Sequence, residues 1–217
     1  MSKIKLNAAS GGGSVSLEAP TSTTGNANVE FKLPVADGSN GQALTTNASG
    51  QLAFASVAGG KIGQVLSTAK TDTFSRNSSS FGDVTGISID ITPAATTSKV
   101  LVLVDLKVGC EHGDGDFHFR LVRDSTVIYA RSTADNRKNG FAGLSKFALD
   151  NANGESTMKV VNAIFLDSPS TTSATTYKVQ VANVSGRLVY INRQGLDSNA
   201  VNIPRAASSI TVMEVLQ

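Results

Sequence analysis

The stretch "SKVLVLVDLKV" (Ser98–Val108) decides the fold class of this chain. Successive side chains of a strand point to opposite faces, so apolar residues at every second position share one face. The other face changes along the stretch, from Leu101 and Leu103 to Asp105 and Lys107. We therefore predict a long strand whose first half is central in a sheet and buried on both sides. The apolar positions of its first face are Val100, Val102, Val104, Leu106 and Val108.

The sequence after this stretch continues the same pattern. "DFHFRLV" (Asp116–Val122) predicts a strand with His118 and Arg120 outward and its apolar residues inward, and "RDS" after it is typical of a hairpin turn. Even spacing and polar turns predict an antiparallel β-sandwich of jelly-roll type over residues 70–217. Its inward residues would include Phe117, Phe119 and Leu121, and its later strands would lie at Ser156–Asp167, Thr175–Ala182, Arg187–Asn192 and Ser208–Leu216.

Residues 1–69 have a different sequence pattern, in which short segments of alternating apolar and polar residues lie between turns rich in glycine, serine and asparagine. Strands are predicted at 3–6, 14–18 and 28–34, and a lone hairpin of strands this short is marginal in water. We predict an N-terminal arm or stalk that is ordered by neighbouring copies, and hence a homotrimer with an all-β fold. The candidates for the shared core and attachment are Phe31, Leu33, Leu44, Leu52 and Phe54.

Composition and charge narrow the function classes. The chain has 217 residues, 17% of them charged, and a net charge of +2, which argues against a dedicated nucleic-acid binder. Its start has no continuous apolar segment of the kind that a secretory signal needs, and no apolar run reaches the roughly 18 residues of a membrane span. The only cysteine, Cys110, is expected to be a small buried residue in a reducing compartment.

The densest polar cluster is "CEHGDGDFHF", in which His112, Asp114, Asp116 and His118 alternate with other residues. Such side chains could surround a cation, but their spacing matches neither a calcium loop nor a zinc motif. A polar turn is the favoured interpretation, and the sequence gives no metal site and no cofactor. A ring of these residues on the axis of a trimer stays open as an alternative.

Catalytic patterns do not emerge either. "SGGGS" lacks the ending of a phosphate-binding loop, no GxSxG motif occurs, and the absence of tryptophan leaves little to stack on sugars in a catalytic cleft. We therefore expect no enzyme. Two C-terminal loops, 131–143 and 192–199, are better candidates for contact with a partner, because rigid strands present loops. The receptor-contact candidates are Arg131, Arg137, Lys138 and Arg193, although an ordinary surface residue is the favoured interpretation of each one taken singly.

The stretch "SVSLEAPTSTTGNANVEFKLPVADGSNGQALTTNASGQLAF" resembles a segment of tail-fibre and other virion proteins of tailed bacteriophages, especially those of marine and cyanobacterial hosts. That segment often ends in tryptophan, where this chain has Phe54. "SSITVMEVL" resembles the last strand of the sandwich that follows such segments. The matching positions are Leu17, Ala19, Pro20, Leu33, Pro34, Asp37, Gly38, Gly41, Gln42, Leu44, Thr46, Ser49, Gly50, Leu52 and Phe54.

The resemblance implies a homotrimeric virion protein that attaches to the particle through its N-terminal region and is made in the host cytoplasm. The long repetitive shaft of a large fibre is missing. This favours a short tail fibre or fibre tip that contacts a glycan or protein on the host surface. A capsid decoration protein that stabilises the head is the alternative, and a polysaccharide-degrading spike is the weakest. Neither nucleic acid nor membrane insertion is expected.

Overall fold

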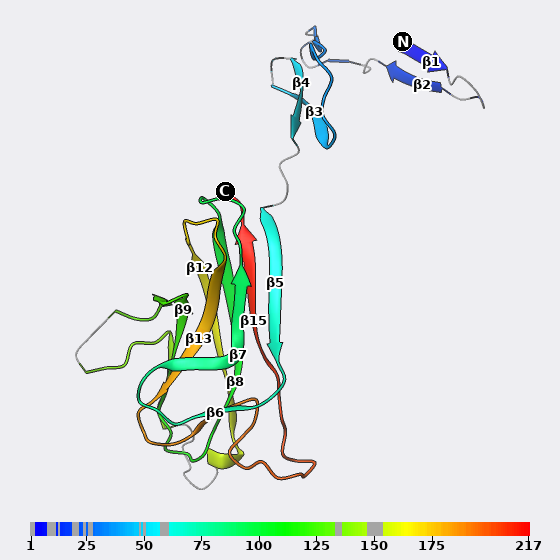
Figure 1. Cartoon of the computed structure of the whole chain (residues 1–217). Coiled ribbons are helices and arrows are strands. Elements are labelled where there is room, and N and C mark those ends of the chain that lie inside the picture. Colours follow the sequence, from blue (N-terminus) through cyan, green and yellow to red (C-terminus); the bar gives the residue numbers. More distant parts are fainter. Residues whose placement is uncertain are drawn as a thin grey trace. The chain divides into compact units, whose positions relative to one another are not determined.

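The computed structural model describes residues 3–7, 12, 14–18, 22–23, 25, 28–47, 49, 51–56, 61–132, 136–146 and 154–217. It divides the chain into two compact units, Met1–Ala58 and Gly59–Gln217 (Figure 1). Strands account for every element but one, a short 3-10 helix (η2, Gly154–Ser156), so the all-β prediction is confirmed for these residues. None of their helical segments is long and apolar enough to cross a membrane.

Unit 1 contains two separate antiparallel hairpins. The first pairs β1 (Lys3–Asn7) with β2 (Ser14–Glu18), and the second pairs β3 (Gln42–Thr46) with β4 (Leu52–Ser56). The strand expected at 28–34 does not form. Among the described residues, this segment makes one isolated bridge to the second hairpin, where the Leu52 amide donates to the Lys32 carbonyl at 2.8 Å.

Unit 2 is a sandwich of two antiparallel sheets. Sheet one has the order β10-β9-β13-β7, with β11 also on β9, and sheet two has the order β5-β15-β8-β14-β6, with β12 also on β8. Successive long strands cross from one sheet to the other, as in jelly rolls. The strands are β5 (Ile62–Lys70), β6 (Phe74–Arg76), β7 (Gly82–Ile91), β8 (Lys99–Cys110), β9 (Phe117–Arg123), β10 (Thr126–Tyr129), β11 (Ala142–Leu144), β12 (Met158–Asp167), β13 (Thr175–Asn183), β14 (Val189–Ile191) and β15 (Ser208–Val215).

The boundary between the units lies between Ala58 and Gly59, and not after residue 69. β5 belongs to the sandwich because it pairs along most of its length with β15, the last strand of the chain. In Figure 1 the cyan β5 lies beside the red β15. β15, predicted as the last strand of the sandwich, lies inside sheet two between β5 and β8.

β8 is the central strand of sheet two, paired along one edge with β12 and along the other with β15 and then β14. Its even-numbered apolar residues are buried as predicted, and so are the inward residues of β9. The second face differs from the prediction: Leu101 and Leu103 are only half-buried, because no strand among the described residues of unit 2 covers the outside of sheet two. The buried residues of these two strands that form the core are Val100, Val102, Val104, Leu106, Val108, Phe117, Phe119 and Leu121.

Candidate functional site

A loop on the edge of sheet one gathers most of the predicted contact residues. β10 pairs with the second half of β9 and β11 with the first half, so the chain between them leaves the edge of β9 and returns to the same edge. The loop closes at its base, where the Arg131 amide donates to the Gly140 carbonyl at 3.3 Å and the Phe141 amide donates to the Phe119 carbonyl at 2.7 Å. Part of this loop projects in green from the side of the domain in Figure 1.

Aromatic packing supports the base of the loop. The ring of Tyr129 stacks on Phe141 at a centroid distance of 5.6 Å and on Phe165 of the other sheet at 4.8 Å. Gly140 is required here, because a Cβ at this position would lie 2.4 Å from the Phe119 carbonyl oxygen. The backbone on which the loop stands is therefore held by the packed sandwich rather than by the loop alone.

Described residues of the loop line an open cavity of about 520 Å³, together with residues of β9 and β11 and Val184. Three of the four predicted contact residues line it: Arg131, Arg137 and Lys138. Among the described residues, no carboxylate belongs to the lining, and none of the three side chains forms an ion pair with an Asp or Glu. Three positive charges thus face one concave surface without a counter-charge from these residues, which is the arrangement of an anion site.

His118 joins this cavity from β9, a residue that the sequence pattern grouped with the metal candidates. Burial lowers the pKa of its imidazole, with nearby Lys138 lowering it further and Asp116 opposing the change. The ring is therefore mainly neutral at pH 7 and offers a hydrogen-bonding nitrogen beside the three cations. Its place follows from the register, in which Gly143 of β11 lies opposite His118 and leaves the space beside the ring open.

Lys138 is also held from the sheet side. Its Nζ lies 5.9 Å from the ring centroid of Phe81, and the guanidinium carbon of Arg120 lies 4.1 Å from the same centroid. Cations over an aromatic face are attracted by the ring quadrupole, so Phe81 helps to fix Lys138 at the rim of the cavity. Sequence reasoning missed Phe81 and did not place His118 beside the loop, because neither residue is near the loop in the chain.

Arg193, the fourth predicted contact residue, does not belong to the cavity. Its guanidinium carbon lies 3.6 Å from the ring centroid of Tyr190, and its Nη1 donates to the Gln194 and Gly195 carbonyls and lies 3.7 Å from an oxygen of Asp197. The stacking on Tyr190 and the three contacts of Nη1 tie this side chain to its own segment, so we assign it a structural role in the connection between β14 and β15.

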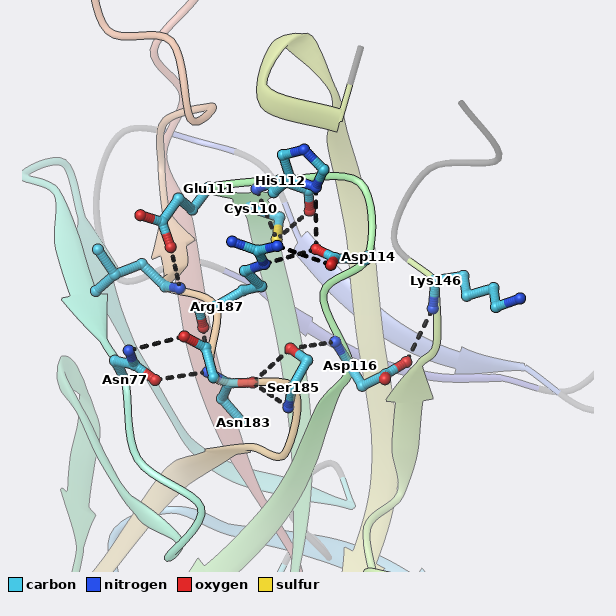
Figure 2. Close-up of polar contacts among 12 residues, drawn as sticks. Asn77, Cys110, Glu111, His112, Asp114, Asp116, Lys146, Asn183, Ser185 and Arg187 are labelled. Atoms are coloured by element: carbon cyan, nitrogen blue, oxygen red, sulfur yellow. Dashed lines mark hydrogen bonds and ion pairs between the residues drawn. The ribbon is translucent and has the colours of Figure 1, made fainter. Parts of the chain in front are cut away.

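The polar cluster after β8 forms two separate sets of contacts, shown in Figure 2. Asp114 accepts two hydrogen bonds from the Arg187 guanidinium, at 2.7 and 2.9 Å, and lies 3.0 Å from His112 Nδ1. Asp116 instead accepts from the Lys146 amide at 2.9 Å, while its own amide donates to Ser185 Oγ at 3.0 Å. The contacts of Asp114 and of the Asp116 amide join the β8–β9 loop to the β13–β14 turn.

The alternating spacing of this cluster therefore does not produce a common centre. Among the described residues, no group of three or more His, Cys, Asp or Glu side chains is placed to hold a metal ion. Asp114 is already neutralised by Arg187, and His118 points to the basic cavity on another strand. Cys110 is buried as expected, with its Sγ donating to the His112 carbonyl at 2.7 Å, and burial raises the pKa of the thiol.

A pH effect follows from the Arg187–Asp114 contact. Hydrogen bonds from Arg187 lower the pKa of Asp114 to about 2, from an ordinary value of 3.8. A lowered folded pKa gives stability that is complete above the unfolded pKa and is lost as the pH falls through the folded one, here from about pH 4 to about pH 2. We expect Asp114→Asn to lower the melting temperature near neutral pH, with the difference from wild type shrinking towards pH 2.

Thermal melts of both proteins across this range measure the effect. Asp90→Asn is the matched control, since the Asp90 carboxylate accepts a hydrogen bond from the Thr176 hydroxyl rather than from an arginine. A melting-temperature difference for Asp114→Asn that stays constant from pH 5 to pH 2 would contradict the assignment of this contact.

The predicted shared-core residues lie in unit 1, and most of them are exposed. Phe31 is 64% and Leu33 75% accessible, while Leu44 and Phe54, which face each other across β3 and β4, are 51% and 40% accessible. Leu52 is half-buried. Beside them lies a cavity of about 300 Å³, whose lining includes Val35, Leu52 and Phe54. This unit therefore shows both protruding apolar side chains and a hollow whose lining is partly apolar and also includes Asp37, Gln42 and Gln51.

A second apolar surface, which sequence reasoning did not identify as exposed, covers the outside of sheet two. We call it the outer band. Register places its members in rows across β12, β8, β15 and β5. Ile164 and Leu166 are 69% and 46% accessible, and Val65 of β5 is 54% accessible. The outer band consists of Ile164, Leu166, Leu101, Leu103, Met213 and Val65.

Comparisons with known proteins give little identity. No model of a protein family matches the chain, and no curated protein does. Among solved structures, infectious bursal virus-derived T=1 particles match with 13% identity over 76% of this chain and 39% of that chain, at a TM-score of 0.32. The infectious bursal disease virus VP2 subviral particle is 15% identical over 76% of this chain and 44% of that chain, at a TM-score of 0.30. The structure of the Gx strain of that virus is 13% identical over 76% of this chain and 39% of that chain, at a TM-score of 0.33.

This chain thus spans less than half the length of the chains it matches. Similarity at this level assigns no function, so the evidence for function comes from the residues of this chain.

Proposed function

We propose that this chain is a non-enzymatic structural protein of a tailed-phage particle, acting as a homotrimeric short tail fibre or fibre tip. Its N-terminal unit would attach to other virion proteins, and loops of the sandwich would contact the host surface. The proposal combines the resemblance of residues 14–54 to phage virion proteins with the exposed apolar side chains of unit 1. It places the protein in the virion, at the tail.

The observation that carries the trimer is the alternation of exposed apolar residues along residues 28–35. Val29, Phe31, Leu33 and Val35 are each more than 60% accessible, a costly arrangement for one chain in water. A neighbouring copy could cover them with its hollow beside Phe54. Three copies would then share a core that one copy is too small to build, and would pair the open strand edges of the two-stranded hairpins.

The outer band supports the same assembly in unit 2. β5 begins at Ile62, directly after unit 1, and Ile62 and Val65 at its start are both exposed. Contact between outer bands would remove the largest apolar side chains of this sheet face from water.

We expect the full chain to sediment at micromolar concentration with about three times the 22.4 kDa mass of one chain. Phe31→Ser combined with Leu33→Ser should convert it to monomers, because each apolar side chain contributes about 1.5–3 kcal/mol when buried. Val127→Ser combined with Val201→Ser is the matched control, since both residues are exposed in unit 2 outside the outer band. A wild-type monomer at this concentration contradicts the proposal.

Capsid decoration is the second candidate, and the open edges of β1, β2 and β3 favour it, because a hairpin can add strands to the sheet of a neighbour. Electron microscopy of particles labelled with antibody to this protein separates the two functions. Label at the tail end supports the fibre, and label spread over the capsid lattice overturns it in favour of decoration. Saturable binding of the purified protein to host cells, with block of infection, is expected only for the fibre.

A further inference from the structure

The basic cavity beside the β10–β11 loop has the size and the lining of a ligand site. Its volume of about 520 Å³ lies within the usual range for small-molecule pockets and is far larger than a single ion needs. The wall includes apolar surface from Phe141, Ala142 and Val184 next to the polar side chains. A ligand with both an apolar face and a negative group would match both parts.

The charges select the chemistry of the ligand. Arg131 and Arg137 can each present a planar fork of donors, which suits carboxylate and sulfate oxygens, and Lys138 adds a point charge. Nucleic acid is disfavoured, because a polyanion backbone needs an extended basic surface. The neighbouring sheet face instead carries the Lys178–Asp83 ion pair and the Arg120–Gln180 hydrogen bond, so positive charge is concentrated at the cavity.

We propose that this cavity binds an acidic sugar residue, one that carries a carboxylate or a sulfate ester, within a polysaccharide of the host surface. The proposal rests on the proposed function, because it gives the chemistry of the partner that the fibre would contact. Arg131 and Arg137 bind the negative group, and His118 hydrogen-bonds a sugar hydroxyl. The fixed base of the loop, with Phe141 stacked on Tyr129, limits the ordering that binding requires.

Binding of the full chain to three immobilised polymers tests the proposal: polygalacturonate, dextran sulfate and unsubstituted dextran. We expect saturable binding to at least one acidic polymer and none to dextran. Arg131→Gln and Arg137→Gln should each weaken that binding about tenfold or more, the effect of losing a charge-assisted hydrogen bond. The preferred polymer distinguishes carboxylate from sulfate as the recognised group.

Lys61→Gln is the charge-matched control, because Lys61 is an exposed residue outside the cavity. Its binding should equal that of wild type. Equal weakening by Lys61→Gln, equal binding to dextran, or no binding to either acidic polymer would each overturn the proposal. Sedimentation of every variant is measured in parallel: trimers without acidic-polymer binding refute the ligand assignment alone, whereas a monomeric wild type refutes the proposed function.

Discussion

Replacing Asp167 with alanine is expected to lower the free energy of unfolding of unit 2 by about 3 kcal/mol, the low end of the cost of breaking a buried ion pair. Asp167 ends β12 in sheet two and connects it to sheet one. Its Oδ2 accepts hydrogen bonds from the Tyr177 hydroxyl of β13 and from Nη1 of Arg123 of β9, both at 2.7 Å. It is 7% accessible, and Tyr177 is fully buried.

The cost comes from the groups that remain. Without the carboxylate, the buried Tyr177 hydroxyl has lost its acceptor, and burial raises the pKa of that hydroxyl so that it stays a donor at every ordinary pH. Arg123 has lost its ion pair, but its side chain is 23% accessible and water can solvate it in part. This partial access is why we expect the low end of the range.

Urea unfolding measures the effect, and three variants define it. Asp167→Asn keeps an acceptor and should cost about 1–2 kcal/mol, and Tyr177→Phe, which keeps the ion pair, about 1 kcal/mol. Asp90→Ala removes an exposed carboxylate that also accepts a hydroxyl hydrogen bond, and should cost under about 1 kcal/mol. For a domain of this size the alanine variant should melt about 6–12 °C lower. If Asp167→Ala and Asp90→Ala lowered the free energy of unfolding equally, the contact of Asp167 between the sheets would stabilise the domain no more than an exposed hydrogen bond does.

Much of the sandwich could be predicted from local alternation. The burial of Val100 to Val108 at every second position, and of Phe117 and Phe119, follows from strand geometry alone and needs no knowledge of the partner strands. The pairing of strands does not follow in this way. The local sequence pattern groups β5 with residues 1–69, whereas its partner strand, β15, lies at the other end of the sequence. Similarly, only the pairing of sheet two shows that Leu103 faces outward.

The candidate site shows the same limit. Arg131, Arg137 and Lys138 lie close together in the sequence, so a common loop was predictable. Their convergence on one cavity depends on β10 and β11 pairing with the same edge of β9, and this pairing also brings in His118. The metal candidates were misleading for a related reason. Arg187, which pairs with Asp114, comes from the β13–β14 turn, far from Asp114 in the sequence. The local sequence around Asp114 therefore does not predict this ion pair.

Asn192 is the site of the second large effect, because it lies where sheet two changes partners. One edge of β8 pairs with β15 up to Asp105 and with β14 from Val108. Asn192, which follows β14, fills the gap: its amide donates to the Lys107 carbonyl at 2.8 Å. Its side-chain nitrogen donates to the carbonyls of Lys70 and Asp72, at 2.8 and 2.9 Å, so the connection from β5 to β6 is held at the same point.

We expect Asn192→Ala to lower the free energy of unfolding by about 3 kcal/mol, through two costs. The side-chain oxygen accepts from Ser208 Oγ at 2.6 Å, so alanine leaves buried groups of Ser208 and Lys70 without this partner, at about 1–3 kcal/mol for a buried group. The carbonyl of Asp72 also loses its contact, but this residue is exposed. The backbone φ of 67° lies in the left-handed region, which asparagine tolerates better than alanine.

Asn192→Gly removes the side chain without that strain and should be about 1 kcal/mol more stable than Asn192→Ala in urea unfolding. Asn199→Ala, at an exposed position of the same connection, should be close to wild type. If Asn192→Ala matched Asn199→Ala, the hydrogen bonds of Asn192 would not be what holds β14 and β15 in line along β8.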